Sequence, residues 1–369
     1  MVIGMRQTQR RIRNLTIVMY RMGVAIMLSS LIGCGKSGGS GTGGAGAEVV
    51  IYCSVDQEYA EEIVDAFHEA HPEINVSTRF DSETTKTTGL VQRLRAERAN
   101  PRADLFWSSE IFQTIRLGQD GVLKPFETEA VRDWPVEYRD SQRRWYAFAG
   151  RARVIAYDAA RTNDPPMNWK DLTDAKYRDR VAMADPVFGT TRGHVAMWYW
   201  WWGGEEAERF LRGLKANRLR VVTSNSQSVR ELLQQTVDFA ITDTDDVWAA
   251  HRNGHRLAVV YPNHGARLGH GKNDEAKDNG TLIIPNTLAF VAGRAETEAV
   301  RMFAEFMLSE RTERLLYESD SHNIPVVFTD AIEVDGRYQV SGPITVDYEE
   351  VSAGMKDAID SAVRIFAGG

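Results

Sequence analysis

The sequence predicts an α/β protein with two lobes that face each other across a cleft. The chain has 369 residues, which is enough for two lobes of about 150 residues each. Apolar runs typical of buried strands alternate with amphipathic helical patterns, and such a series occurs twice along the chain. This alternation favours mainly parallel sheets with helices on both faces. Ligands of such sheets bind beyond the carboxyl ends of the strands.

The composition indicates a globular protein with a mildly acidic surface. Apolar residues make up 43% of the chain, charged residues 26%, and the formal net charge is -7. No long basic run follows the first 21 residues, so we expect no nucleic-acid partner. The H-E-x-x-H and P-loop motifs are absent from the sequence. We therefore expect a protein that is not an enzyme and has no cofactor.

Residues 1–33 have the pattern of an export signal. An apolar stretch covers residues 23–32, which is too short for a membrane span of about 20 residues but suits a secretory signal. It ends in Leu31-Ile32-Gly33-Cys34, which resembles a bacterial lipobox and implies a lipid anchor on Cys34. An ordinary signal peptide with a chance cysteine is the alternative. A basic segment precedes the apolar stretch. Its arginines are Arg6, Arg10, Arg11, Arg13 and Arg21.

Residues 34–47 are rich in glycine and serine and predict a flexible tether. The folded part should therefore begin near Glu48. Cys34 and Cys53 are the two cysteines of the chain, so acylation of the first excludes an intramolecular disulfide. Cys53 lies in an apolar run and is predicted to be a buried strand residue.

The first lobe should begin with a β-α-β-α-β series. We predict strands at 49–53, 74–80 and 104–107, and helices at 59–70 and 84–98. The loops that follow the strands are the ones closest to a cleft, and they cover 54–57, 81–85 and 108–110. Asp56 and Glu110 lie in the first and third of these loops and are therefore candidate ligand-binding residues.

The second series continues the pattern and returns to the first lobe. We predict strands at 153–157, 181–185, 220–223, 239–242, 281–284 and 288–292, and helices at 296–309, 312–319 and 346–366. Pro285 is expected where the chain crosses back between the lobes. The expected first lobe consists of residues 48–150 and 286–325, and the expected second lobe of residues 151–285 and 326–369. Such lobes can close on a ligand by hinge motion.

Seven segments in this order resemble the ABC-transporter substrate-binding proteins of the iron(III) type, extracellular solute-binding family 1. They are VIYCSVD at 50–56, ADLFW at 103–107, GRARV at 150–154, ADP at 184–186, GTTRGH at 189–194, IPNT at 284–287 and NIP at 323–325. The resemblance implies a type II periplasmic-binding-protein fold, the venus-flytrap, with two mixed sheets. It also implies that the chain carries a metal ion or small solute to ABC permease subunits outside the cytoplasm, as a monomer.

Two segments suggest an anion site at helix starts. Gly189-Thr190-Thr191-Arg192-Gly193 follows a predicted strand and precedes the helical run 194–202, and residues 224–228 repeat the arrangement around Ser226. Exposed N–H groups, the helix dipole and hydroxyl groups would bind an anion such as a phosphonate. Ordinary helix capping is the alternative.

Two arginines on the crossover strand are further candidates. Arg151 and Arg153 alternate along the strand, so both side chains project to the same side. The resemblance implies that an arginine in this position contacts a bound anion, which a guanidinium can hold in two-pronged fashion. An interlobe salt bridge made by one of them is the alternative.

The acidic segment Thr242-Asp243-Thr244-Asp245-Asp246 points to a different cargo. Iron-carrying relatives have adjacent tyrosines here, and this chain has none, which puts phenolate ligation of Fe(III) in doubt. Asp243 and Asp245 remain candidate metal ligands, because hard cations prefer oxygen donors. They could instead receive an ammonium group, or Asp245 could cap the next helix while Asp243 holds a loop.

Other aromatic and histidine residues have simpler interpretations. The run of four tryptophans and one tyrosine at 198–202 is predicted to pack in the core, because consecutive helical residues point in different directions. His251, His255, His264 and His270 lack metal-site spacing and are predicted to lie on the surface or in loops. A sensor for a signalling partner and a hydrolase are the alternative functions.

Overall fold

In the computed structural model, two mixed sheets are joined through long central strands. The structure describes residues 47–81, 87–265, 267, 280–340 and 343–367. Along the main path the strand order is β2-β1-β3-β10-β5-β8-β6-β7, with β4 beside β10 and β9 beside β5. The strands are β1 (Ala47–Cys53), β2 (Ile74–Phe80), β3 (Leu105–Ser108), β4 (Leu123–Lys124), β5 (Trp145–Tyr157), β6 (Val181–Ala184), β7 (Arg220–Val222), β8 (Phe239–Asp243), β9 (Ala258–Val260) and β10 (Ile283–Val291).

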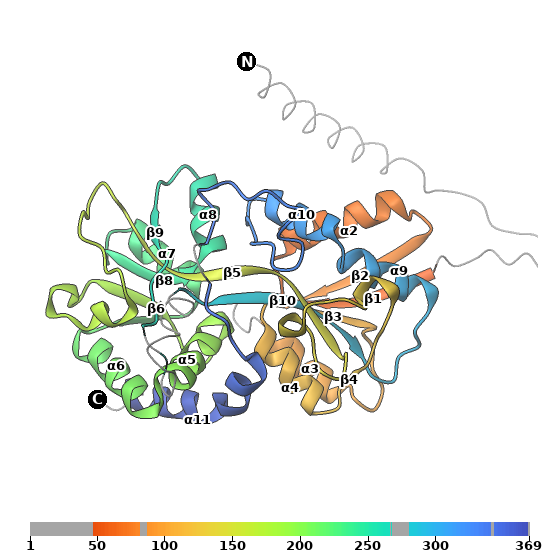
Figure 1. Cartoon of the computed structure of the whole chain (residues 1–369), viewed down its shortest axis with the longest axis horizontal. Helices are drawn as coiled ribbons and strands as arrows, with labels where there is room; N and C mark the ends of the chain where they lie inside the picture. The colour runs from red at the N-terminus through yellow and green to blue at the C-terminus, as the bar shows by residue number, and fades with distance from the viewer. Residues whose placement is uncertain (1–46, 82–86, 266, 268–279, 341–342, 368–369) are drawn as a thin grey trace, which may run out of the picture. The chain divides into compact units, whose positions relative to one another are not determined.

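The strands β5 and β10 cross between the two halves (Figure 1). They pair antiparallel, and the pairing register shifts between Pro285 and Asn286. In the first half β1, β2 and β3 are parallel, and in the second half β6, β7 and β8 are parallel. Each half therefore combines a parallel set with an antiparallel crossing strand, as the predicted fold of two mixed sheets requires.

The helices follow the strands in the predicted alternation. They are α2 (Gln57–Ala70), α3 (Thr88–Ala96), α4 (Ile111–Gln119), α5 (Gly189–Trp202), α6 (Gly204–Ala216), α7 (Asn225–Leu233), α8 (Thr244–Arg252), α9 (Glu298–Met307), α10 (Glu310–Glu318) and α11 (Tyr348–Ala367). Helix α11 packs against α5, α6 and α4. In the part of the chain that the structure describes, no helix is both long and apolar enough to span a membrane.

Two strands and one helix differ clearly from their predicted bounds. Strand β10 is continuous where two strands were expected, because the ladder absorbs Pro285, which lacks an N–H, by shifting register. Strand β5 begins at Trp145 instead of residue 153. Helix α5 begins at Gly189 instead of residue 194, and Gly189 turns the chain into it with a φ of +54° that side chains disfavour.

The buried core explains the aromatic run. Trp198, Trp201 and Trp202 of α5 are buried, as predicted. His264 was predicted to lie on the surface or in a loop, and it is instead buried against these tryptophans. Burial lowers the pKa of His264 to about 3, so its ring is neutral. Cys53 is a buried free cysteine on β1, as predicted. Cys34, the expected signal peptide, all of the tether but Ala47, and His270 lie outside the described residues.

Candidate functional site

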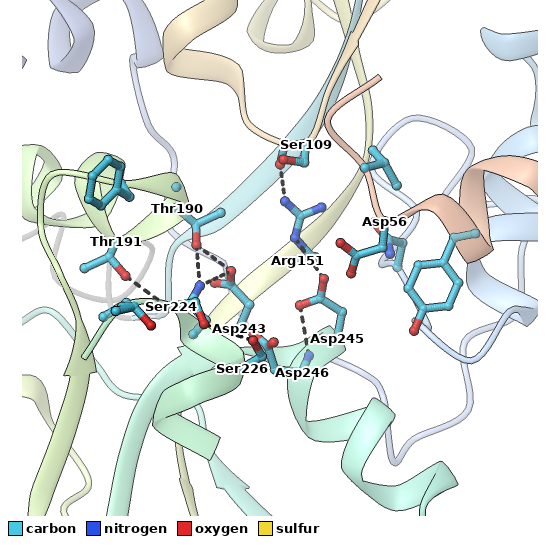
Figure 2. Close-up of a pocket in the computed structure, with 18 residues that line it drawn as sticks. Asp56, Ser109, Arg151, Thr190, Thr191, Ser224, Ser226, Asp243, Asp245 and Asp246 are labelled. Carbon is cyan, nitrogen blue, oxygen red and sulfur yellow. Dashed lines mark hydrogen bonds and ion pairs between the residues drawn. The ribbon is translucent and has the colours of Figure 1, made fainter. Parts of the chain in front are cut away.

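A pocket lies where the strand ends of both halves meet the crossing strand β5. Its cavity volume is about 80 Å³, which is room for an ion or for a molecule of a few heavy atoms, since one water needs about 10–15 Å³. Figure 2 shows the lining side chains converging on this space. They are Val55, Asp56, Tyr59, Ser109, Arg151, Ala184, Phe188, Gly189, Thr190, Thr191, Thr223, Ser224, Asn225, Ser226, Asp243, Asp245, Asp246 and Asn323.

The structure brings most of the candidate residues into one lining. Seven of the nine candidates line the pocket, namely Asp56, Arg151, Thr190, Thr191, Ser226, Asp243 and Asp245. Glu110 and Arg153 are not part of the lining. Sequence reasoning did not single out Tyr59, Phe188, Asn225 or Asn323. Of these, Asn225 lies in the segment 224–228, which was considered for an anion site, and Asn323 lies in the segment 323–325, which contributes to the family resemblance.

Glu110 caps a helix instead of lining the pocket. It is buried, and its carboxyl oxygens accept hydrogen bonds from the backbone N–H groups of Phe112 at 2.8 Å and Gln113 at 3.1 Å. These two groups begin α4, which would otherwise lack partners for them. Burial raises the pKa of Glu110 to about 7, against the opposing effect of these backbone hydrogen bonds. The expected ligand contact of Glu110 is replaced by this cap.

Arg153 lies behind the lining and contacts the residues that form it. Its Nη1 donates to Asp243 Oδ1 at 2.7 Å and to Thr190 Oγ1 at 3.2 Å, and its Nη2 donates to Thr191 Oγ1 at 3.4 Å. Its Nε donates to His194 Nδ1 at 3.1 Å. The side chain is completely buried. Burial, with a contribution from Arg153, lowers the pKa of His194 well below its usual range, so this ring accepts as a neutral imidazole.

The threonine hydroxyl groups point into this network. Thr190 Oγ1 donates to Asp243 Oδ2, and Thr191 Oγ1 donates to Asn225 Oδ1 at 3.0 Å. Asn225 Nδ2 in turn donates to Asp243 Oδ2 at 2.8 Å. Both hydroxyl hydrogens are therefore used within the protein. Thr190 and Thr191 line the pocket, and the role of their hydroxyl groups in binding an anion stays a prediction.

The start of α5 is part of the pocket lining. Gly189, Thr190 and Thr191 lie in its first turn and line the cavity, and Phe188 before them supplies no side-chain cap. The first N–H groups of a helix have no partner within the helix, and they carry the positive end of its dipole. By contrast, Ser224 caps α7 by accepting from the N–H of Gln227 at 3.1 Å. The start of α5 is thus suited to hold an anion.

Arg151 occupies the middle of the pocket. Its Nε lies 3.3 Å from Asp245 Oδ2, its Nη1 donates to Asn286 Oδ1 at 3.2 Å, and its Nη2 donates to the carbonyl oxygen of Ser109. Figure 2 shows the guanidinium between Ser109 and Asp245. Arg151 therefore connects the crossing strand with a loop of the first half and a helix start of the second.

Three carboxylates form the acidic side of the pocket. Oxygen atoms of Asp243, Asp245 and Asp246 lie within 4.8 Å of one another. Asp243 precedes α8 but does not cap it with its side chain. Asp245 Oδ1 accepts from the N–H of Asp246 at 3.1 Å. Tyr59 is the one tyrosine among the described residues of the lining. Burial, followed by the charge of Asp245, raises the pKa of Tyr59, which disfavours a phenolate.

Two mixed sheets, crossing strands and a pocket between the strand ends define a type II periplasmic binding protein, the venus-flytrap class. Hinge motion of two halves around a ligand is typical of such proteins. The chain belongs to the bacterial extracellular solute-binding protein family, whose model matches residues 62–338.

Relatives of this chain are named for different ligands. The major ferric iron-binding protein of Neisseria meningitidis serogroup A is 23% identical over 277 residues, which cover 73% of this chain and 78% of that protein. The putative 2-aminoethylphosphonate-binding periplasmic protein of Salmonella typhi is 23% identical over 304 residues, which cover 78% of this chain and 84% of that protein. The fold of iron-bound HitA from Pseudomonas aeruginosa matches with a TM-score of 0.72 at 22% identity, over 86% of this chain and 99% of that one.

Proposed function

We propose that this chain is an exported solute-binding protein that captures a small solute bearing an oxyanion and delivers it to the permease of an ABC importer. The observation that carries the choice of an oxyanion is the start of α5, which lines the pocket without a side-chain cap. A phosphate or phosphonate group matches this site because its oxygens accept hydrogen bonds from several backbone N–H groups at once. The relative named for 2-aminoethylphosphonate supports this class of cargo.

A metal ion is the second candidate cargo. The cluster of Asp243, Asp245 and Asp246 favours it, as do the relatives that bind ferric iron. Against it stands the state of Asp243, whose oxygens already accept bonds from Arg153, Thr190 and Asn225. The lining residues that the structure describes also lack the pair of tyrosines expected of a ferric site.

The lipobox-like segment that ends at Cys34 supports a lipid anchor at the cell envelope. We further propose that the folded part works as a monomer, tethered by the glycine-rich residues that follow Cys34. Neither catalysis nor a cofactor is part of this proposal. Cargo would leave the pocket chemically unchanged.

A thermal-shift panel tests the proposed cargo. The purified folded part is heated with inorganic phosphate, methylphosphonate, 2-aminoethylphosphonate, a sugar phosphate, ferric citrate or zinc chloride. We expect an oxyanion to raise the melting temperature, because a ligand at about 100 times its Kd stabilises the folded state by about 2.7 kcal/mol. Arg151→Ala should reduce this shift.

The panel also separates the alternatives. A response to metal ions and to none of the oxyanions would contradict the proposed cargo. Conversion of the responding ligand, followed by ³¹P NMR over a day of incubation, would contradict a pure binding function. Recovery of the ligand unchanged is the result we expect.

A further inference from the structure

Arg153 donates hydrogen bonds to three residues of the pocket lining, although it does not line the pocket itself. Its three nitrogen atoms all donate to residues of the second half, and the side chain is fully buried on β5. Two of its partners, Thr190 and Thr191, form the first turn of α5. A third partner, Asp243, ends β8. The guanidinium group of Arg153 thus holds the start of α5, the proposed anion site, and the acidic segment 242–246 in a fixed position relative to each other.

The contacts of Asp243 decide what the acidic cluster can do. Its Oδ1 accepts from Arg153, and its Oδ2 accepts from Thr190 and Asn225. These three donors use most of the acceptor positions of the carboxylate, so a metal ion bound by Asp243 would compete with them and would lie close to the guanidinium charge. Because hard cations need several carboxylate oxygens, these contacts make Asp243 a weaker metal ligand than an unpaired carboxylate would be.

The same contacts favour an anion at α5. The charge of Arg153 balances the carboxylate of Asp243, which would otherwise repel an anion at the neighbouring helix start. By donating to the two threonine oxygen atoms, Arg153 also orients their hydroxyl hydrogens away from itself, toward Asp243 and Asn225. The backbone N–H groups of this turn receive no side-chain cap, and the turn lines the pocket.

We propose that Arg153 is the specificity-determining residue of this pocket, which selects an oxyanion over a metal cation without touching either. This inference rests on the proposed solute-binding function and deepens it. Arg153 acts through Asp243 and the start of α5, so it is a positioning residue. Its removal should change the affinities for anions and cations in opposite directions, which a merely structural role would not do.

The test compares binding of two probes by calorimetry. The probes are methylphosphonate and lanthanum chloride, a hard trivalent cation without redox chemistry, each titrated in a phosphate-free buffer. For Arg153→Met we expect the methylphosphonate affinity to fall at least tenfold and the lanthanum affinity to rise at least tenfold. Arg153→Lys, which keeps the positive charge, should retain the preference of the unmodified protein.

Two further variants keep the test decisive if Arg153→Met does not fold. Asp243→Asn leaves the charge of Arg153 unbalanced, so the methylphosphonate affinity should rise severalfold while lanthanum binding stays weak. The double variant Arg153→Met with Asp243→Asn lacks both charges and should not gain lanthanum affinity.

The outcomes distinguish this inference from the proposed function. Equal losses for both probes in Arg153→Met, or a loss of methylphosphonate affinity in Asp243→Asn, would overturn the role of Arg153. If the unmodified protein binds no oxyanion of the panel, the proposed cargo fails, and the lanthanum gain of Arg153→Met still decides the role of Arg153. A gain in lanthanum affinity that persists in the double variant would also overturn it.

Discussion

The starts of α4 and α5 are built alike but used in opposite ways. Each helix follows a parallel strand of its half of the molecule, β3 before α4 and β6 before α5. Before α4 stands Glu110, whose carboxyl group accepts the first backbone N–H groups. Before α5 stands Phe188, which provides no such acceptor, and the first turn lines the pocket. The preceding side chain thus decides whether the first N–H groups of a helix are capped, as at α4, or left without a side-chain cap, as at α5.

The largest expected effect comes from making α5 resemble α4. In Phe188→Asp the new carboxylate should accept the N–H groups of the first turn and repel an anion. We expect the affinity for the oxyanion found in the panel to fall about 100-fold, which corresponds to about 2.7 kcal/mol. Calorimetric titration measures this, with Phe188→Leu as the control that keeps an apolar side chain. If the oxyanion affinity of Phe188→Asp stays within about threefold of that of the unmodified protein, the contrast drawn between the starts of α4 and α5 is wrong.

A smaller effect should appear at α4 as a dependence of stability on pH. The pKa of Glu110 is raised from 4.5 to about 7 in the folded state, chiefly by burial. The folded protein therefore binds this proton more tightly than the unfolded chain does. The stabilisation is fully present below pH 4.5 and is lost as the pH rises toward 7. Relative to Glu110→Gln, the protein should lose about 2 kcal/mol between about pH 5.5 and pH 7.5.

Chemical unfolding at several pH values measures this difference. Glu110→Gln keeps an acceptor for the cap and removes the titration, whereas Glu110→Ala removes the cap and should lower stability at every pH. A constant difference between the protein and Glu110→Gln across this range would show that the carboxyl group does not titrate as described.

Much of the fold was predictable because its signals are local. The strand Ile74–Phe80 alternates along its length and was predicted with the bounds that the structure has. The errors at β5 and β10 arose where strand pairing overrides local pattern. Pro285 predicts a break in an isolated strand, but a neighbouring strand allows the ladder to shift register instead.

The sequence allowed us to predict which residues gather near the pocket, but not the contacts that each of them makes. The sequence analysis placed Asp56, Thr190 and Asp243 at the carboxyl ends of strands, where ligands of such sheets bind. In the structure all three residues line one pocket. The alternation along β5 put Arg151 and Arg153 on one side, yet it could not say which of them lines the pocket. That depends on the packing of α5 and β8 around the strand, which brings Thr190, Thr191, His194 and Asp243 to Arg153.

A crystal structure of the protein with its oxyanion tests the central claim most directly. The account predicts that oxygen atoms of the ligand lie within hydrogen-bond distance of the backbone nitrogens of Gly189, Thr190 and Thr191, with the Asp243–Arg153 ion pair intact. A ligand bound away from the start of α5, or a metal ion held by Asp243, Asp245 and Asp246 with Arg153 displaced, would contradict it.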